Sequence, residues 1–181
     1  MFFKLSLALL MFLCFGATAF GGDNTPKPQL GKQLTPKELA YIAITVFPSG
    51  EGSPRGQGTA RQGAILYEEQ CAACHGTKGT GGTAHKLAGS DGGWSTGASW
   101  PYATSIYDYV RRAMPPFNVK ELSDDEVYAL TAYILYLNDL SDIDTVHNQS
   151  TLPKVEMPAK AYSHNKWEQE ERHNSRKILN Q

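Results

Sequence analysis

The chain is poor in cysteine, in long apolar runs and in net charge. Its 181 residues include only three cysteines, and 17 basic residues nearly balance 18 acidic ones, for a formal net charge of −1. So few cysteines exclude a small exported domain held together by several disulfides. The near-neutral charge excludes the basic field that attracts nucleic acid or anionic membranes. We therefore expect no nucleic-acid partner.

The longest apolar run lies at the N-terminus, over residues 5–16, behind Lys4 and before Ala17-Thr18-Ala19. A positive residue, a short apolar run and small residues at a cleavage position are typical of an export signal. The run is shorter than the roughly 20 apolar residues that span a bilayer. The sequence therefore predicts a periplasmic protein with no membrane anchor, cleaved near Ala19.

Cleavage would leave Cys71 and Cys74 as the remaining cysteines, in the string "CAACHG" with His75 directly behind them. C-x-x-C-H is the attachment signature of a c-type haem. Each thiol forms a thioether with one vinyl group of the porphyrin, and the histidine ligates the iron. The motif therefore predicts one covalently bound haem c.

Three other interpretations of the cysteine pair were weighed: a disulfide, half of a zinc site and a thioredoxin-like redox site. A structural zinc site needs four protein ligands, and the mature chain offers no further cysteine. A thioredoxin-like site needs a βαβ context, which the glycine-rich stretch after the motif does not supply. The C-x-x-C-H motif, together with an export signal, favours haem attachment over all three.

A low-spin electron carrier needs a sixth iron ligand, and the methionines left after cleavage are Met114 and Met157. Met114 precedes two prolines, which restrict the backbone and can present the thioether rigidly. Methionine and histidine ligation together close the iron to other ligands and favour electron transfer. His85 is the rival ligand, and Met157 lies in a stretch expected to be extended. We predict Met114 as the ligand.

Helical spacing of apolar residues predicts three helices, over about residues 59–71, over 103–114 and from Ser123 onward. The second is expected to have Thr104 or Ser105 as N-cap, with Tyr109 facing inward. Ser123 with Glu126 forms a capping box for the third. The glycine-rich stretch 76–99 is expected to be a long functional loop.

Four segments follow from this pattern. They are a signal peptide (1–19), an extended N-terminal arm (20–58), a helical domain (59–140) and a polar C-terminal tail (141–181). The string "ELAYIAITVF" is expected to be an extended part of the arm or a short strand, and "TLPKVEMP" to be extended. The histidines of the last segment are expected to be solvated: His147, His164 and His173.

The order G-x-x-L-Y-x-x-x-C-x-x-C-H-G, a glycine-rich loop, "MP" and a closing amphipathic helix resembles class I cytochromes c over about residues 59–140. The strings "PSGEGSPRGQGTARQGAILYEEQCAACHG", "WPYATSIYDYVRRAMP", "LSDDEVYALTAYILYLN" and "TLPKVEMP" resemble the cytochrome subunits of bacterial sulfite and sulfane dehydrogenases over about residues 47–158. The resemblance implies an all-α class I cytochrome c fold around one covalent haem.

The resemblance also implies roles for individual residues. Cys71 and Cys74 carry the thioether links, His75 is the proximal ligand and Met114 the distal ligand. Four further residues are implied as haem-binding: Trp100 and Tyr102 as pocket wall, and Arg111 or Arg112 as the partner of a haem propionate.

One feature departs from the family pattern. Such cytochromes often have a proline after the motif whose carbonyl accepts the second ring N–H of the proximal histidine, and the stretch "AHKLAG" has none. We expect a carbonyl within residues 86–88 to orient His75 instead.

The expected function is single-electron transfer by a protein that is not itself an enzyme. By resemblance, the electron donor is a molybdenum-cofactor dehydrogenase subunit acting on sulfur compounds, and the acceptor is another cytochrome or a terminal oxidase. Two alternatives remain open. One is a general soluble carrier without a dedicated partner, and the other is a haem enzyme acting on sulfur compounds, which needs an open or unusual sixth position.

Overall fold

A computed structural model describes residues 31–89 and 94–163 of the chain. Nearly all of these residues lie in the second of two compact units, Lys37–Gln181. The predicted signal peptide and residues 164–181 of the polar tail, with His164 and His173, lie outside the described residues. No helix in the described ranges is long and apolar enough to cross a membrane.

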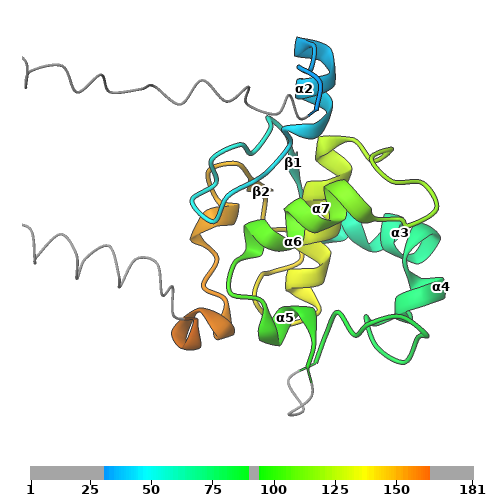
Figure 1. The fold of residues 1–181 in the computed structure, drawn as a ribbon. Helices are drawn as coiled ribbons and strands as arrows, with labels where there is room; N and C mark the ends of the chain where they lie inside the picture. Colours follow the sequence, from blue (N-terminus) through cyan, green and yellow to red (C-terminus); the bar gives the residue numbers. More distant parts are fainter. Residues whose placement is uncertain (1–30, 90–93, 164–181) are drawn as a thin grey trace, which may run out of the picture. The chain divides into compact units, whose positions relative to one another are not determined.

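The described part of the second unit is built from helices joined by long loops (Figure 1). The longest helices are α3 (Ala60–Gln70), α6 (Ala103–Ala113) and α7 (Asp124–Tyr136). The shorter ones are α2 (Pro36–Ile42), α4 (Ala72–His75), α5 (Thr96–Ser99) and the 3₁₀ turns η1 (Leu152–Lys154) and η2 (Pro158–Tyr162). Within the described ranges, the strands are limited to the two-residue pair of β1 (Gln57–Gly58) and β2 (His147–Asn148). The all-α expectation is confirmed.

Helices α3 and α7 form the main contact of the fold, and both begin with a capping box, of which the sequence analysis predicted the one at α7. Thr59 and Gln62 cap α3, and Ser123 and Glu126 cap α7. Reciprocal side-chain and backbone hydrogen bonds of this kind satisfy N–H groups that the helix itself leaves free. The two helices approach so closely that a Cβ on Gly63 would overlap the Ala129 carbonyl. A glycine is therefore required at this crossing.

Helix α6 differs from its prediction at the N-terminus. Its N-cap is Tyr102, which makes no capping hydrogen bond through its side chain, and Thr104 lies buried inside the first turn. The inward aromatic residue is Tyr107, which is fully buried, whereas Tyr109 is half-exposed. The predicted cap was wrong because the N-cap lies two residues before Thr104, which places the buried Thr104 inside the helix.

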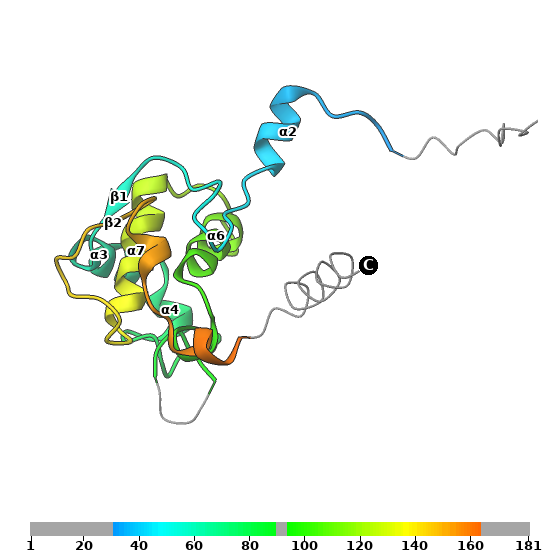
Figure 2. The same cartoon turned by 90° about the vertical axis from the view of Figure 1, so that its left-hand side faces the viewer.

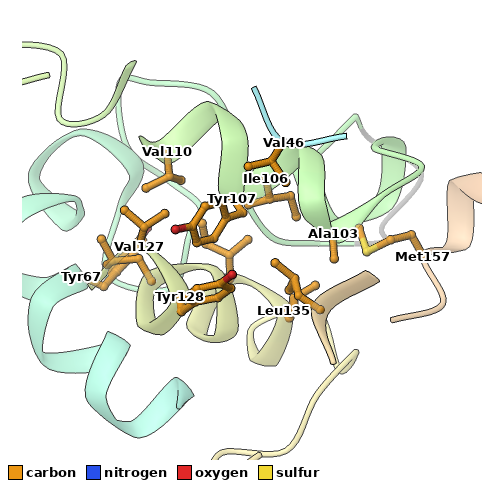
Figure 3. Packing of buried hydrophobic residues seen from close by; sticks show 13 residues of the cluster. Val46, Tyr67, Ala103, Ile106, Tyr107, Val110, Val127, Tyr128, Leu135 and Met157 are labelled. Carbon is orange, nitrogen blue, oxygen red and sulfur yellow. The ribbon is translucent and has the colours of Figure 1, made fainter. Parts of the chain in front are cut away.

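The core lies where α6 and α7 meet, and Figure 3 shows its packed side chains. Tyr107 and Tyr128 stack at its centre, with ring centroids 4.4 Å apart and an interplanar angle of 41°. The hydroxyl of Tyr107 donates to Asp124 at 3.2 Å, and that of Tyr128 donates to the Pro54 carbonyl at 3.0 Å. Burial first, and Asp124 second, raise the pKa of Tyr107 well above its usual range. Both tyrosines are therefore neutral core residues with satisfied hydroxyls.

The predicted extended conformation of the arm near "ELAYIAITVF" was wrong, because Pro36–Ile42 form the helix α2. Proline is well tolerated in the first turn of a helix, and Glu38 is favoured there by the helix dipole. The residues that follow pack on α6, where Val46 is buried in the core (Figure 3). Val46 is therefore part of the packed core although it lies before residue 59.

Two predictions for the C-terminal part were also wrong. "TLPKVEMP" contains the 3₁₀ turn η1 rather than a fully extended segment. His147 is 3% exposed, not solvated, because β2 pairs it with Gly58 of β1. Figure 2 shows these two strands side by side although they are far apart in the sequence.

Candidate haem site

An apolar cavity of about 460 Å³ lies between α3, α4, α6 and α7. Its wall is completed by residues from the segments 84–87, 94–100 and 114–122. The residues of the cavity that carry chemistry or aromatic surface are Tyr67, Cys71, Cys74, His75, His85, Trp94, Trp100, Tyr109 and Met114. The structure thus brings both cysteines, His75, Met114 and Trp100 of the prediction to one cavity.

The C-x-x-C-H segment occupies a tight junction between two helices. Cys71 ends α3 and begins α4, which is a single turn ending at His75. Gly76 follows with φ = +80°, and a Cβ there would overlap the Thr80 carbonyl. Glycine is therefore the residue that lets the chain reverse directly after the histidine. This reversal keeps the three side chains of the motif on one short turn.

The two cysteines of the motif are free thiols. Cys71 is partly buried and Cys74 is exposed. Burial, with a smaller contribution from Cys74, raises the pKa of the Cys71 thiol to about 11. Cys71 is therefore a neutral thiol at pH 7 rather than an activated thiolate of the kind used in thiol–disulfide exchange.

His75 is oriented by a backbone carbonyl. Its Nδ1 lies 2.7 Å from the carbonyl oxygen of His85. With Nδ1–H as donor, Nε2 is left as the free ligating nitrogen. The predicted range of 86–88 missed this carbonyl by one residue. The loop closes early because the Ala84 amide donates to the Cys74 carbonyl at 2.8 Å.

The side chain of His85 packs against Trp94, with ring centroids 4.1 Å apart and an angle of 68°. Its backbone carbonyl accepts from His75. His85 is therefore tied to the segment that supports the proposed proximal ligand. Nothing in the sequence pattern marked Trp94 or the His85 carbonyl as part of the site, because both depend on the path of the loop.

Met114 ends α6 and lines the cavity. Its amide donates to the Val110 carbonyl at 3.1 Å. A turn follows, in which the Asn118 amide donates to the Pro115 carbonyl at 3.0 Å. The backbone that carries the Met114 thioether is therefore fixed by a hydrogen bond at the end of α6. Met157 is 3% exposed and packs in the core beside Ala103, away from the cavity lining (Figure 3).

The remaining predicted residues divide between the cavity and other surroundings. Trp100 lines the cavity and meets Tyr109 edge to face, with centroids 5.6 Å apart. Tyr102 is partly buried but is not among the cavity residues. Tyr67 and Trp94 line the cavity although the sequence analysis did not single them out, and Tyr109, which it expected to face inward, lines the cavity as well. Tyr67 could have been found from its place one helical turn before Cys71.

Arg111 and Arg112 have partners outside the cavity. Arg111 lies 3.2 Å from Asp124 and donates to the Ile44 carbonyl at 3.1 Å. Arg112 pairs with Asp108 through two nitrogens, at 2.8 and 3.0 Å. The pairing of either arginine with a haem propionate stays a prediction.

The residues present fit a covalently attached haem. The cavity wall is overwhelmingly apolar, two free thiols stand at the spacing of the attachment motif, and one imidazole has its second nitrogen already hydrogen-bonded. These are the features that hold a flat hydrophobic macrocycle and leave Nε2 to an iron. A disulfide or a zinc site would need no such cavity.

Two comparisons with known proteins bear on this assignment. Residues 58–134 match the family model described as cytochrome c oxidase, cbb3-type, subunit III. A chain in the crystal structure of the sulfane dehydrogenase SoxCD from Paracoccus pantotrophus is similar over 76% of this chain and 72% of that one. That match has 34% sequence identity and a TM-score of 0.69.

A similarity of this extent and identity reaches well beyond a shared fold. The family match covers the C-x-x-C-H turn, Met114 and most of α7, and a domain of this family carries covalently bound haem c. The structural match confirms the resemblance to sulfur-compound dehydrogenases that the sequence strings indicated. The chain therefore belongs to the cytochrome c family and has the class I cytochrome c fold.

Proposed function

We propose that this protein is a periplasmic, single-haem electron carrier that accepts electrons from a molybdenum-containing dehydrogenase of sulfur compounds and passes them to another cytochrome or an oxidase. The observation that carries the proposal is that the free thiols, His75 and Met114 line one apolar cavity. Haem c, when bound, supplies a reversible one-electron couple at its iron.

The chain's own residues favour transfer of electrons over catalysis on a bound substrate. His75 is held by the His85 carbonyl with Nε2 free, and Met114 hangs from the end of α6. We assign these two as the axial ligands. Ligation by both leaves no open position for a sulfur compound or peroxide. The apolar wall excludes water, which limits the reorganisation that accompanies each change of charge.

The arm favours a dedicated partner over free diffusion as a general carrier. Helix α2 buries none of its residues, and Leu39, Tyr41 and Ile42 are each at least half exposed. A seven-residue helix with no buried residue is marginal in water even with the contact of Lys120 on the Tyr41 ring, and clustered exposed apolar side chains mark interaction sites. The segment that follows α2 is attached to α6, because Asp108 Oδ1 accepts the Val46 amide at 2.7 Å. We assign this arm to contact with the dehydrogenase, because a similar chain occurs in SoxCD.

The experiment mixes the oxidised holoprotein with the molybdenum dehydrogenase and its sulfur substrate. We expect fast reduction in the complete mixture, followed by the visible spectrum of the haem in stopped flow. The protein alone, given sulfite or thiosulfate, should turn over little.

Two results would contradict the proposal. Oxidation of the substrate by the isolated chain at the rate of the mixture would make the protein a haem enzyme. Equal reduction by the dehydrogenase and by unrelated periplasmic reductases would make it a general carrier without a dedicated donor.

A further inference from the structure

Tyr67 is a buried cavity residue that the proposed function leaves without a role. It is 1% exposed and lines the cavity from α3. Its hydroxyl donates to the carbonyl of Gly76 at 2.9 Å. Gly76 is the residue directly after His75, so this hydrogen bond reaches the backbone next to the proposed proximal ligand.

The Gly76 carbonyl sits at the start of a small network of backbone hydrogen bonds. The Gly79 amide also donates to it, at 3.0 Å. The carbonyl of Gly79 in turn accepts the amides of Leu87 at 2.8 Å and Ala88 at 3.2 Å. The network therefore joins the turn after His75 to the segment that carries the His85 carbonyl.

The other end of Tyr67 is fixed by the main helix contact. Its ring packs against Tyr133 of α7, with centroids 5.1 Å apart and an angle of 58°. A close approach at Gly63, one turn earlier in α3, holds the same two helices together. The hydroxyl is thus presented from a rigid platform rather than from the loop itself.

We propose that Tyr67 is a positioning residue that holds the His75 turn against the segment of His85 and so sets the strength of the hydrogen bond from His75 Nδ1–H to the His85 carbonyl. This rests on the proposed role of His75 as the proximal ligand. That hydrogen bond raises the basicity of the imidazole, and a more basic ligand favours the oxidised iron. Tyr67 therefore keeps the reduction potential lower than it would be with a loose turn.

The test is Tyr67→Phe in the holoprotein, which keeps the ring contact with Tyr133 and removes the hydroxyl. We expect a higher reduction potential and several-fold faster solvent exchange of the His75 Nδ1 proton, measured by NMR on the reduced protein. Folding should survive, because the Gly76 carbonyl keeps its bond from the Gly79 amide. The matched control is Tyr133→Phe, which removes a hydroxyl from the same ring pair without touching the Gly76 turn, and both readouts should match the unaltered protein.

Two outcomes overturn the inference. One is a Tyr67→Phe protein whose potential and proton exchange equal those of the unaltered protein, even if its stability falls, because the hydroxyl then serves folding alone. The other is an equal change in the control, which would assign the effect to the ring pair. Loss of reduction by the dehydrogenase in the unaltered protein is a separate result, which contradicts the proposed function and leaves the hydrogen-bond test standing.

Discussion

The two sides of helix α6, which has eleven residues, face different surroundings. On one side Ile106, Tyr109 and Val110 line the apolar cavity, and Met114 continues this face at the helix end. On the other side Asp108 accepts the Val46 amide, and Arg112 donates to the Thr45 hydroxyl. Successive residues turn by about 100° around a helix, so residues only two positions apart face different surroundings. The cavity side presents apolar side chains and Met114, whereas the charged side chains of the opposite side are hydrogen-bonded to the preceding segment of the chain.

The contrast explains why neighbours of Met114 in the sequence are not its neighbours in space. Arg111 and Arg112 come just before Met114, yet they pair with Asp124 and Asp108. Charged groups with good protein partners are poorly available to a ligand, because breaking a partly buried pair leaves one charge uncompensated. In this structure the arginines are paired with Asp124, Asp108 and the chain at residues 44–45, whereas Met114 lines the apolar cavity.

The largest effect is expected on the cavity side, at Met114. Met114→Ala should abolish the weak sulfur-to-iron charge-transfer absorption of the oxidised protein, lower the reduction potential and let cyanide bind readily. The physical reason is the loss of the soft thioether that closes the sixth position. Optical spectroscopy, a redox titration and a cyanide titration measure the three effects.

The matched control is Met157→Ala, at a methionine buried in the core away from the cavity lining. It should cost stability, about 2–5 kcal/mol for truncation of a buried methionine, and leave the absorption band intact. Ligation by Met157 would reverse the two results. An unchanged spectrum in Met114→Ala together with cyanide binding in His85→Ala would assign the ligand to His85.

A smaller effect is expected on the opposite side of α6. Asp108→Ala removes the acceptor for the Val46 amide and the partner of Arg112. We expect a loss of about 1–3 kcal/mol in the free energy of unfolding, as for donors left without a partner. Reduction by the dehydrogenase should slow, because the segment around Val46 is no longer fixed to α6, while the absorption band of the haem stays unchanged.

Asp144→Ala is the control for Asp108, since it removes another carboxylate paired with an arginine, Arg61. Both partners of that pair are more than half exposed, so solvent screens it and its loss should change stability and reduction rate little. A shifted haem spectrum in Asp108→Ala would contradict the conclusion that the Asp108 side of α6 acts independently of the cavity side. An unaltered rate of reduction in Asp108→Ala would contradict the proposal that the arm contacts the dehydrogenase.

The smallest effect is expected away from both sides of α6, at His147. Burial lowers its pKa in the folded protein, and its Nε2 lies 2.7 Å from Ser141 Oγ. The folded state thus favours neutral His147, so stability is complete above the unfolded pKa of about 6.5 and falls as the pH drops below it. Urea unfolding at pH 7 and pH 5 should show a larger loss in the unaltered protein than in His147→Gln. Equal losses would mean that protonation of other groups controls acid stability.

The predictions from sequence succeeded where local chemistry is decisive. The C-x-x-C-H motif, the capping box of Ser123 with Glu126 and the helical spacing that follows act over a few residues, and each corresponds to what the fold contains. Met114 was singled out from its prolines and from the ligand that a carrier requires, and the fold places it at the cavity. The predictions failed for residues whose surroundings come from distant segments. The burial of His147 by the pairing of β2 with β1 is an example.

Sequence by itself determined the covalent motif, the three long helices and the membership of the cytochrome c family, because each depends on residue types at fixed short spacings. Tertiary structure alone decided which carbonyl holds His75, which face of α6 meets the cavity and where the hydroxyl of Tyr67 is directed. Those outcomes depend on the path of a glycine-rich loop and on the crossing of α3 with α7. Loop paths and helix crossings are set by the packing of residues far apart in the chain, which no local pattern encodes.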